Sequence, residues 1–351
     1  MATLQNFDFA YNSWIEYARK NQLDFDVEKF KRLTEKLESK KLPIIIGSAS
    51  LALFLGVSER QLESVLGARH KFYRQFEIPK RSGGVRSIAC PYPFLYNMQK
   101  TILLRILNPY CSAAIEGNAH GFLQGRSIKS NAQAHAANHK KQLLKLDISD
   151  FFGSVKQMAV QEIFREMGYG DKIARVLGRL CCHQGYLPQG APTSPALSNL
   201  AFTGYDQKIN AVCTDLGLIY TRYADDMSIS GDDVRVMVDN IEAILIEGVF
   251  RLNHKKTKVY NSGFSITGVS ISEGELRLPK KVKRQYRQDI YFIRKYGILA
   301  SMNRQAENKF RYPEVVLGRL QHWLNIEGIS EELEEAFDVY WRSINAYGLT
   351  G

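Results

Sequence analysis

Two adjacent aspartates, Asp225 and Asp226, lie between two runs of strand-forming residues, 219–224 and 227–230. β-Branched and aromatic residues on both sides of a short polar break predict a β-hairpin. Like charges at its tip repel each other unless solvent screens them or a cation lies between them. Aspartate is a favoured turn residue, and carboxylate oxygens are also preferred ligands of Mg2+. The tip is therefore either a solvated acidic turn or part of a metal site.

A third carboxylate favours the metal site. Asp147 follows the apolar run Leu-Leu-Lys-Leu (143–146), which predicts a buried strand with an acid at its end. A buried, unpaired carboxylate there is costly for folding. With Asp225 and Asp226 it predicts a site for two Mg2+ ions about 3.5–4 Å apart, and the Ile148 carbonyl is a further candidate ligand. In this interpretation the carboxylates are metal ligands rather than general bases.

The charge of the chain indicates a polyanionic partner. The 351 residues carry a formal net charge of +11, and residues 251–312 hold 15 Lys and Arg against four acids, so this segment accounts for the whole excess. A local basic surface of this kind is typical of nucleic-acid binding. No apolar run approaches the roughly 18 residues of a membrane span, and the first residues lack the pattern of a signal peptide. We therefore expect a cytoplasmic protein without a membrane partner.

The five cysteines are odd in number and lack C-x-x-C spacing, which argues against a disulfide framework and a zinc site. Helical and strand patterns alternate along the chain, as in an α+β fold. The expected strands are two within 71–88, one at 143–148 and the two of the hairpin. The expected helices lie at 26–39, 94–107, 131–139, 158–180, 196–214, 234–246 and within 279–347. One residue of a second acidic pair, Asp232 or Asp233, is expected to cap the helix at 234.

Five short motifs occur in the order in which the reverse transcriptase family carries them. They lie at residues 73–86 (YRQFEIPKRSGGVR), 146–152 (LDISDFF), 187–195 (LPQGAPTSP), 223–226 (YADD) and 252–257 (LNHKKT). Over roughly residues 70–270 the chain thus resembles a reverse transcriptase. The resemblance implies an α+β right-hand polymerase with fingers, a palm (an antiparallel sheet with packed helices) and a helical thumb. The implied boundaries are an N-terminal helical extension at 1–70, fingers at 71–139, a palm at 140–275 interleaved with fingers elements, and a basic thumb at 276–351.

The resemblance also assigns roles to single residues. Lys80 and Arg86 would bind the incoming deoxynucleoside triphosphate, although an exposed basic hairpin gives the same pattern. The backbone of Asp150 and Phe151 would lie beneath it, and Phe152 would exclude a ribose 2′-hydroxyl unless it is plain core. Gln189 would line the nucleotide pocket. Lys256 would lie near the triphosphate, with Lys255 as a rival.

Two weaker motifs resemble the retron subgroup of bacterial reverse transcriptases. Asn131 to His135 fits N-A-x-x-H, although a helix histidine is the simpler interpretation of His135, and Ile266-Thr267-Gly268 approximates V-T-G. The subgroup implies a structured noncoding RNA as template and primer, with initiation at a guanosine 2′-hydroxyl. The product would be RNA-linked, multicopy single-stranded DNA. The subgroup also implies a role in antiphage defence, with an effector protein as a partner.

Two alternatives stay open at this point. One is a group II intron-like or other bacterial reverse transcriptase without the retron RNA. The other is a non-catalytic nucleic-acid-binding protein on a polymerase fold, which the presence of all three aspartates disfavours.

Overall fold

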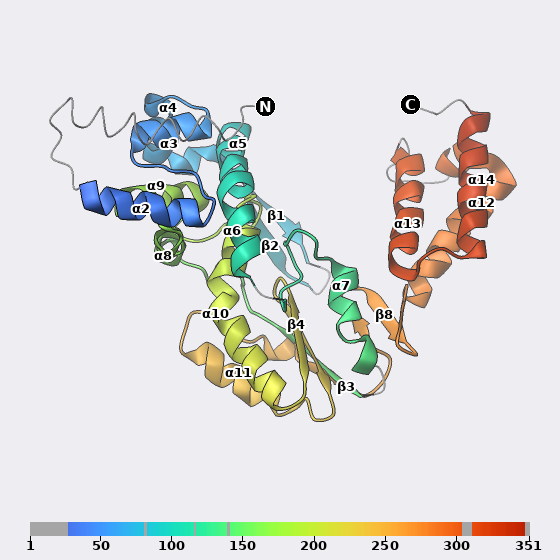
Figure 1. Cartoon of the computed structure of the whole chain (residues 1–351). Coiled ribbons are helices and arrows are strands. Elements are labelled where there is room, and N and C mark those ends of the chain that lie inside the picture. Colours follow the sequence, from blue (N-terminus) through green and yellow to red (C-terminus); the bar gives the residue numbers. More distant parts are fainter. Residues whose placement is uncertain (1–26, 81–82, 116, 139–140, 304–310, 348–351) are drawn as a thin grey trace. The chain divides into compact units, whose positions relative to one another are not determined.

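The computed structural model describes residues 27–80, 83–115, 117–138, 141–303 and 311–347. The chain divides into two compact units, each of which collects separate segments of the sequence. Figure 1 labels the helices and strands and colours them by sequence position. The first unit comprises residues 1–125, 148–209 and 241–253. The second comprises residues 126–147, 210–240 and 254–351. Their helices and antiparallel sheets confirm the α+β class. None of the helices in the described residues is both long and apolar enough to cross a membrane.

The first unit is mainly helical and carries one two-stranded antiparallel sheet. Its strands are β1 (Tyr73–Pro79) and β2 (Val85–Pro91), so the hairpin expected within 71–88 is confirmed. Its helices are α2 (Val27–Ser39), α3 (Ser48–Leu55), α4 (Glu59–Gly67), α5 (Pro93–Ile102), α6 (Asn108–Ala114), α8 (Gln157–Met167) and α9 (Asp171–Cys181). A π-helical turn, Leu103–Leu107, joins α5 to α6.

The prediction of one continuous helix over 158–180 is wrong. The chain forms two helices, α8 and α9, because Gly168 ends α8 in the left-handed conformation, with φ of 119°. Glycine is favoured there since it has no Cβ to clash. Gly170 then begins α9 from an extended conformation. The two glycines flanking Tyr169 were the signal for this break.

The second unit is built on a four-stranded antiparallel sheet in the order β4-β5-β3-β6. The strands are β3 (Gln142–Asp147), β4 (Ile219–Tyr223), β5 (Asp226–Gly231) and β6 (Lys258–Tyr260). This unit also holds helix α7 (Ile128–Gln133) and short 3-10 turns at Ala136–Asn138 and His254–Lys256. The long helix α10 (Ser194–Asp215) and helix α11 (Met237–Ile246) contribute residues to both units.

Successive residues of a strand point to opposite faces of a sheet, and here the two faces differ in chemistry. One face carries buried apolar side chains, including Leu144, Leu146, Met227 and Ile229. The other face is largely polar. It carries Lys145 and Asp147 on β3, Asp226, Ser228 and Ser230 on β5, and Thr221 and Tyr223 on β4. We call it the polar face below.

A second sheet of three short strands was not expected from the sequence. It consists of β7 (Ser265–Ile266), β8 (Val269–Ser272) and β9 (Glu275–Arg277). Its two turns, Thr267-Gly268 and Glu273-Gly274, each place both residues at positive φ, as the tightest hairpin turns require. The glycines after Thr267 and Glu273 were the signal, but runs this short give little alternation to detect.

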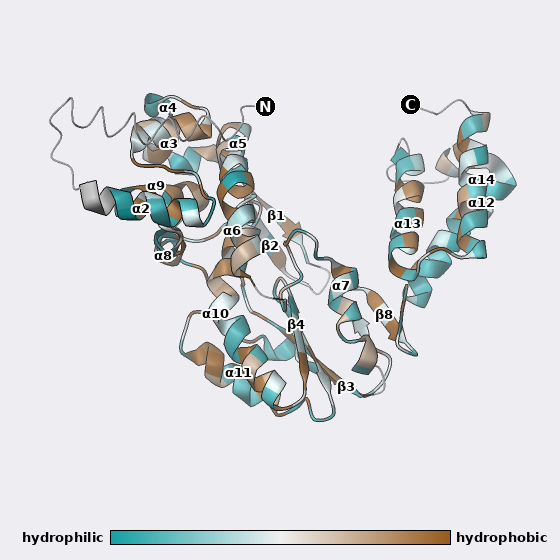
Figure 2. Ribbon diagram, in the orientation of Figure 1, coloured by the Kyte–Doolittle hydropathy of each residue, from teal (hydrophilic) through white to brown (hydrophobic). Residues whose placement is uncertain are grey.

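The C-terminal helices pack on this small sheet around a common core. They are α12 (Lys280–Asn303), α13 (Tyr312–Glu327) and α14 (Glu331–Ala346), which confirms the helical pattern expected within 279–347. Hydrophobic and hydrophilic residues alternate along them (Figure 2), and the apolar positions surround the buried Trp323. Helix α12 is kinked at Gly297, whose φ of 76° and ψ of 164° are not helical.

The helix expected at 234–246 begins later, at Met237. Asp232 therefore does not cap it, and its carboxylate instead pairs with the Lys141 ammonium at 3.0 Å. The side chain of Asp232 is 82% exposed. The second acidic pair is thus an exposed loop feature.

Candidate active site

The hairpin that carries the adjacent aspartates has a two-residue turn. Tyr223 pairs with Asp226 across β4 and β5, which leaves Ala224 and Asp225 as the turn. Ala224 has φ of 58°, a conformation that residues other than glycine rarely adopt. The guanidinium of Arg222, which is fully buried, donates a hydrogen bond to the Ala224 carbonyl over 2.9 Å. A buried side chain therefore supports the strained residue beside the two aspartates.

The third aspartate lies beside this hairpin. Strand β3 pairs with β5 so that Asp147 stands directly opposite Asp226, and direct cross-strand neighbours have Cβ atoms about 4.5–5.5 Å apart. Asp147 is 4% exposed. The structure thus brings two carboxylates together on the polar face, with Asp225 at the adjoining turn, as the sequence predicts.

The charges of these groups act on one another. The pKa of Asp226 is raised, first because the surrounding protein limits its hydration and then because Asp225 and Asp147 repel its negative charge. The Lys256 ammonium lies 2.5 Å from Asp147 Oδ1. Its hydrogen bond to Asp147 raises the pKa of Lys256. Of the two lysines weighed from the sequence, Lys256 is thus the one whose ammonium contacts the acidic cluster.

The carboxylates of Asp147, Asp225 and Asp226 are suited to a divalent cation that also has substrate oxygens among its ligands. In the described part of the chain, no three acidic, histidine or cysteine side chains form a ready metal cage. Mg2+ in proteins is commonly held by one or two carboxylates together with substrate phosphates, rather than by an all-protein cage. Burial first, and then repulsion by Asp225 and Asp147, raises the pKa of Asp226, and a bound cation would relieve both costs.

One residue of the polar face was missed from the sequence. Lys145 lies two residues before Asp147 on β3, and it therefore shares the polar face with Asp226. The pKa of Lys145 is lowered, chiefly because burial disfavours its charge, and the negative charge of Asp226 partly opposes this shift. The period-two alternation of a strand was the signal that could have identified it.

The other predicted substrate-binding residues lie in the first unit. Lys80 follows β1, and Arg86 is exposed on β2. The Gln189 carbonyl accepts a hydrogen bond from the Ala89 amide over 2.8 Å, which holds this loop against β2. A Cβ on Gly190 would lie 3.0 Å from the Ala89 carbonyl oxygen, so the close approach requires glycine. The roles of Lys80, Arg86 and Gln189 stay predictions.

Three further residues of the first unit lie shortly after the end of β3. Asp150 has φ of 43°, and Phe151 is 3% exposed within a cluster formed with Phe202 and Phe250. Phe152 is half-buried, and its ring centroid lies 6.3 Å from that of Phe122. Phe151 is therefore core, whereas Phe152 keeps part of its ring accessible. The Ile148 backbone bridges to Leu252, and its role as a metal ligand stays a prediction.

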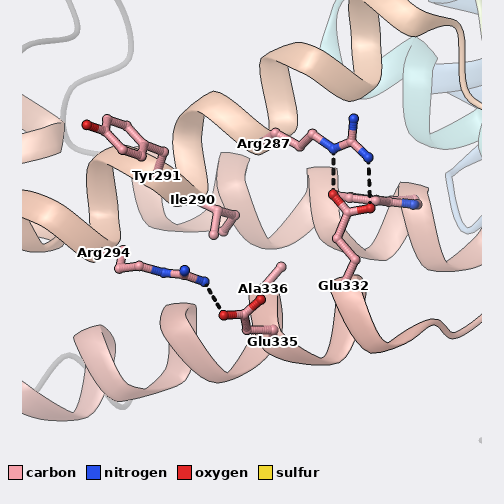
Figure 3. Close-up of a pocket in the computed structure, with 8 residues that line it drawn as sticks. Arg287, Ile290, Tyr291, Arg294, Glu332, Glu335 and Ala336 are labelled. Atoms are coloured by element: carbon pink, nitrogen blue, oxygen red, sulfur yellow. Dashed lines mark hydrogen bonds and ion pairs between the residues drawn. The ribbon is translucent and has the colours of Figure 1, made fainter.

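The basic C-terminal segment uses part of its charge internally. Arg287 forms two hydrogen bonds with Glu332, and Arg294 pairs with Glu335 over 2.7 Å (Figure 3). Lys283 pairs with Glu327 over 2.7 Å. Lys280, Lys281 and Arg284 lie exposed along the first turns of α12. These three cations are the better candidates for contact with a phosphate backbone.

The aromatic residues of α12 divide between core and surface. Tyr286 packs against the core and its hydroxyl lies 2.9 Å from His322 Nδ1. Tyr291 and Tyr296 are 54% and 39% exposed, and the Lys295 ammonium lies over both rings. Exposed aromatics beside cations can stack on unpaired bases, so Tyr291 and Tyr296 are candidates for contact with RNA.

The raised pKa of Asp226 predicts a pH-dependent stability. An acid whose pKa is raised on folding contributes most to stability at pH values below its pKa in the unfolded chain, which is near 3.8 for aspartate. This contribution is lost as the pH rises through the pKa of the folded state. In EDTA at pH 7, Asp226→Asn should therefore raise the melting temperature by roughly 1–3 °C, since partly exposed charges are worth little. The gain should vanish near pH 4.

Thermal melts of both proteins between pH 4 and pH 8 measure this effect. Mg2+ should stabilise the wild type but not Asp226→Asn. Asp232→Asn is the matched control and should show no gain at any pH. A lower melting temperature for Asp226→Asn at pH 7 would contradict the repulsion described above.

Residues 78–271, more than half of the chain, match the family "Reverse transcriptase (RNA-dependent DNA polymerase)". The chain is similar to the retron Mx65 reverse transcriptase of Myxococcus xanthus, with 33% identity over 64% of this chain and 57% of that protein. It is similar to the retron Ec86 reverse transcriptase of Escherichia coli, with 30% identity over 74% of this chain and 82% of that protein. The chain thus spans little more than half the length of the Myxococcus relative.

Among solved structures, telomerase from Candida albicans, in complex with a fragment of telomeric RNA, aligns with a TM-score of 0.44. The identity is 11%, and the alignment covers 81% of this chain and 65% of that one.

Proposed function

Because the chain belongs to the reverse transcriptase family and to its retron members, we propose that it is an RNA-directed DNA polymerase. It copies a cognate structured noncoding RNA into RNA-linked single-stranded DNA. The observation that carries the proposal is the register of β3 and β5, which sets Asp147 opposite Asp226 beside the turn that holds Asp225. A non-catalytic protein on the same fold would have no need to keep three mutually repelling carboxylates at one strand end.

The side chains of this site support nucleotidyl transfer in separate ways. Asp147, Asp225 and Asp226 would hold two Mg2+ ions, which when bound lower the pKa of an attacking hydroxyl and neutralise a leaving pyrophosphate. The Lys256 ammonium pairs with Asp147, and in this proposal it would contact a triphosphate when one binds. Arg222 holds the strained turn from the opposite face of the sheet. The chain thereby positions its carboxylates before a substrate arrives.

The proposal also assigns the substrate contacts. Lys80 and Arg86 on the β1–β2 hairpin would contact the deoxynucleoside triphosphate. The exposed cations of α12, with Tyr291 and Tyr296, would contact the RNA, since affinity for nucleic acid comes largely from phosphate neutralisation. An effector protein and a role in antiphage defence belong to the proposal through the retron resemblance alone.

Sequencing of total nucleic acid from cells that express the gene with its upstream flank tests the retron proposal. We expect an abundant short single-stranded DNA joined to RNA, absent from cells that express the Asp225→Ala variant. Intact protein without such a product would contradict the retron assignment. DNA synthesis on added templates by the same protein would then favour a group II intron-like or other bacterial reverse transcriptase.

A further inference from the structure

His135 connects the two strands of the catalytic hairpin. Its imidazole is completely buried. Nδ1 lies 2.7 Å from Ser230 Oγ on β5, and Nε2 lies 2.8 Å from Thr221 Oγ1 on β4. A neutral imidazole offers one donor and one acceptor, and a hydroxyl can serve as either. Both hydrogen bonds can therefore form in either tautomer, and one ring ties β4 to β5.

The histidine reaches these strands on the side that carries the aspartates. Thr221 pairs with Ser228, two residues along β5 from Asp226, and Ser230 lies a further two residues along. Because alternate residues share a face, both hydroxyls lie on the polar face with Asp226. The register of β3 places Asp147 on the same face.

The segment that carries His135 is itself held firmly. Ala132 and Ala136 are buried in the core of the second unit. Asn138 Nδ2 donates to the carbonyl and the hydroxyl of Ser230, each over 3.2 Å. At the other end of the segment, Asn131 Nδ2 lies 3.4 Å from Thr267 Oγ1, at the strained turn between β7 and β8. The imidazole therefore has little freedom to follow the hairpin if the hairpin moves.

We propose that His135 is a positioning residue for polymerisation, which fixes the twist of the hairpin so that Asp225 and Asp226 stand correctly beside Asp147. The inference rests on the proposed polymerase function. Mg2+ demands near-ideal octahedral geometry, and a misplacement of about 1 Å at a reacting centre can cost about 10²-fold in rate. A histidine remote from the reacting atoms can thus control kcat without contacting substrate.

The test separates hydrogen bonding from packing. His135→Phe keeps a ring of similar size but leaves the hydroxyls of Thr221 and Ser230 without the imidazole. The triple variant His135→Phe/Thr221→Val/Ser230→Ala removes both sides of each bond, which can restore stability even though the single change costs it. His183→Ala is the control. His183 is also a buried histidine, but its Nε2 lies 2.7 Å from the side-chain nitrogen of Gln75 on β1, not beside the β4–β5 hairpin.

We expect His135→Phe to lower the melting temperature and to lower kcat about 30- to 100-fold with a small change in KM. The triple variant should regain stability but not kcat. Mn2+ titration followed by electron paramagnetic resonance gives a readout that needs no activity, and binding should weaken at least threefold in both variants. His183→Ala should lose stability only. Recovery of kcat and Mn2+ binding in the triple variant, or unchanged Mn2+ binding in His135→Phe, would overturn the proposal.

Failure of the polymerase proposal would be seen separately. In that case the folded wild type makes no DNA, and Mn2+ binding alone decides whether His135 positions the carboxylates.

Discussion

Asp225→Ala and Asp226→Ala should each lower the rate of DNA synthesis by roughly 10³-fold or more, because a lost metal ligand removes several kcal/mol of charge stabilisation from the transition state. Asp226 stands opposite Asp147 in the sheet, and Asp225 occupies the adjoining turn. Neither aspartate is part of the apolar core. The variants should therefore remain folded, and the loss should appear in kcat rather than in protein yield.

Two measurements make this prediction specific. RNA binding, followed by filter retention, should stay within about threefold of the wild type, because phosphate contacts rather than the carboxylates supply the affinity. Asp232→Ala is the matched control, since it removes a nearby but exposed aspartate of the loop after β5. It should retain wild-type synthesis. Equal losses in Asp232→Ala and Asp225→Ala would indicate a general effect of charge removal instead of a metal site.

Phe152→Ala should have the second largest effect, on the choice of sugar. Phe152 is half-buried and its ring packs against Phe122, so the loss of the ring opens space without emptying the core. If the ring excludes a 2′-hydroxyl, the ratio of kcat/KM for deoxyribonucleotides to that for ribonucleotides should fall roughly 10- to 100-fold. Single-nucleotide incorporation with paired dNTP and rNTP substrates measures this ratio.

The neighbouring phenylalanine and a conservative variant serve as controls. Phe152→Tyr keeps the ring and should keep the selectivity. Phe151→Ala empties a buried site beside Phe202 and Phe250, and it should destabilise the protein by about 3–5 kcal/mol. Unchanged sugar selectivity in a folded Phe152→Ala variant would refute the steric role.

Local sequence patterns predicted the elements around the candidate site well. The hairpin around Asp225 and Asp226 and the strand that ends at Asp147 have strong strand-forming runs, and both are confirmed. The pairing of Asp147 with Asp226 links residues nearly eighty positions apart, and no local pattern encodes it. The link was inferred from the chemistry of an acid at the end of an apolar strand, and the register of the strands then showed it.

Features that depend on tertiary contacts were not predicted. An arginine in a strand is usually exposed to solvent, yet Arg222 is fully buried under the turn that it supports. His135 reads as an ordinary helix histidine, because its two hydroxyl partners lie on strands almost a hundred residues later. The break at Gly168 was visible in the sequence but outweighed by helical periodicity on both sides.

Primer extension by the purified protein shows whether the chain is an RNA-directed DNA polymerase. The reaction contains an RNA template, a DNA primer and deoxynucleoside triphosphates, and the Mg2+ concentration is varied from zero upward. We expect template-directed DNA synthesis that requires Mg2+, stops with EDTA and is absent in Asp225→Ala. Folded wild-type protein that binds the template but adds no nucleotide at any Mg2+ concentration would contradict it.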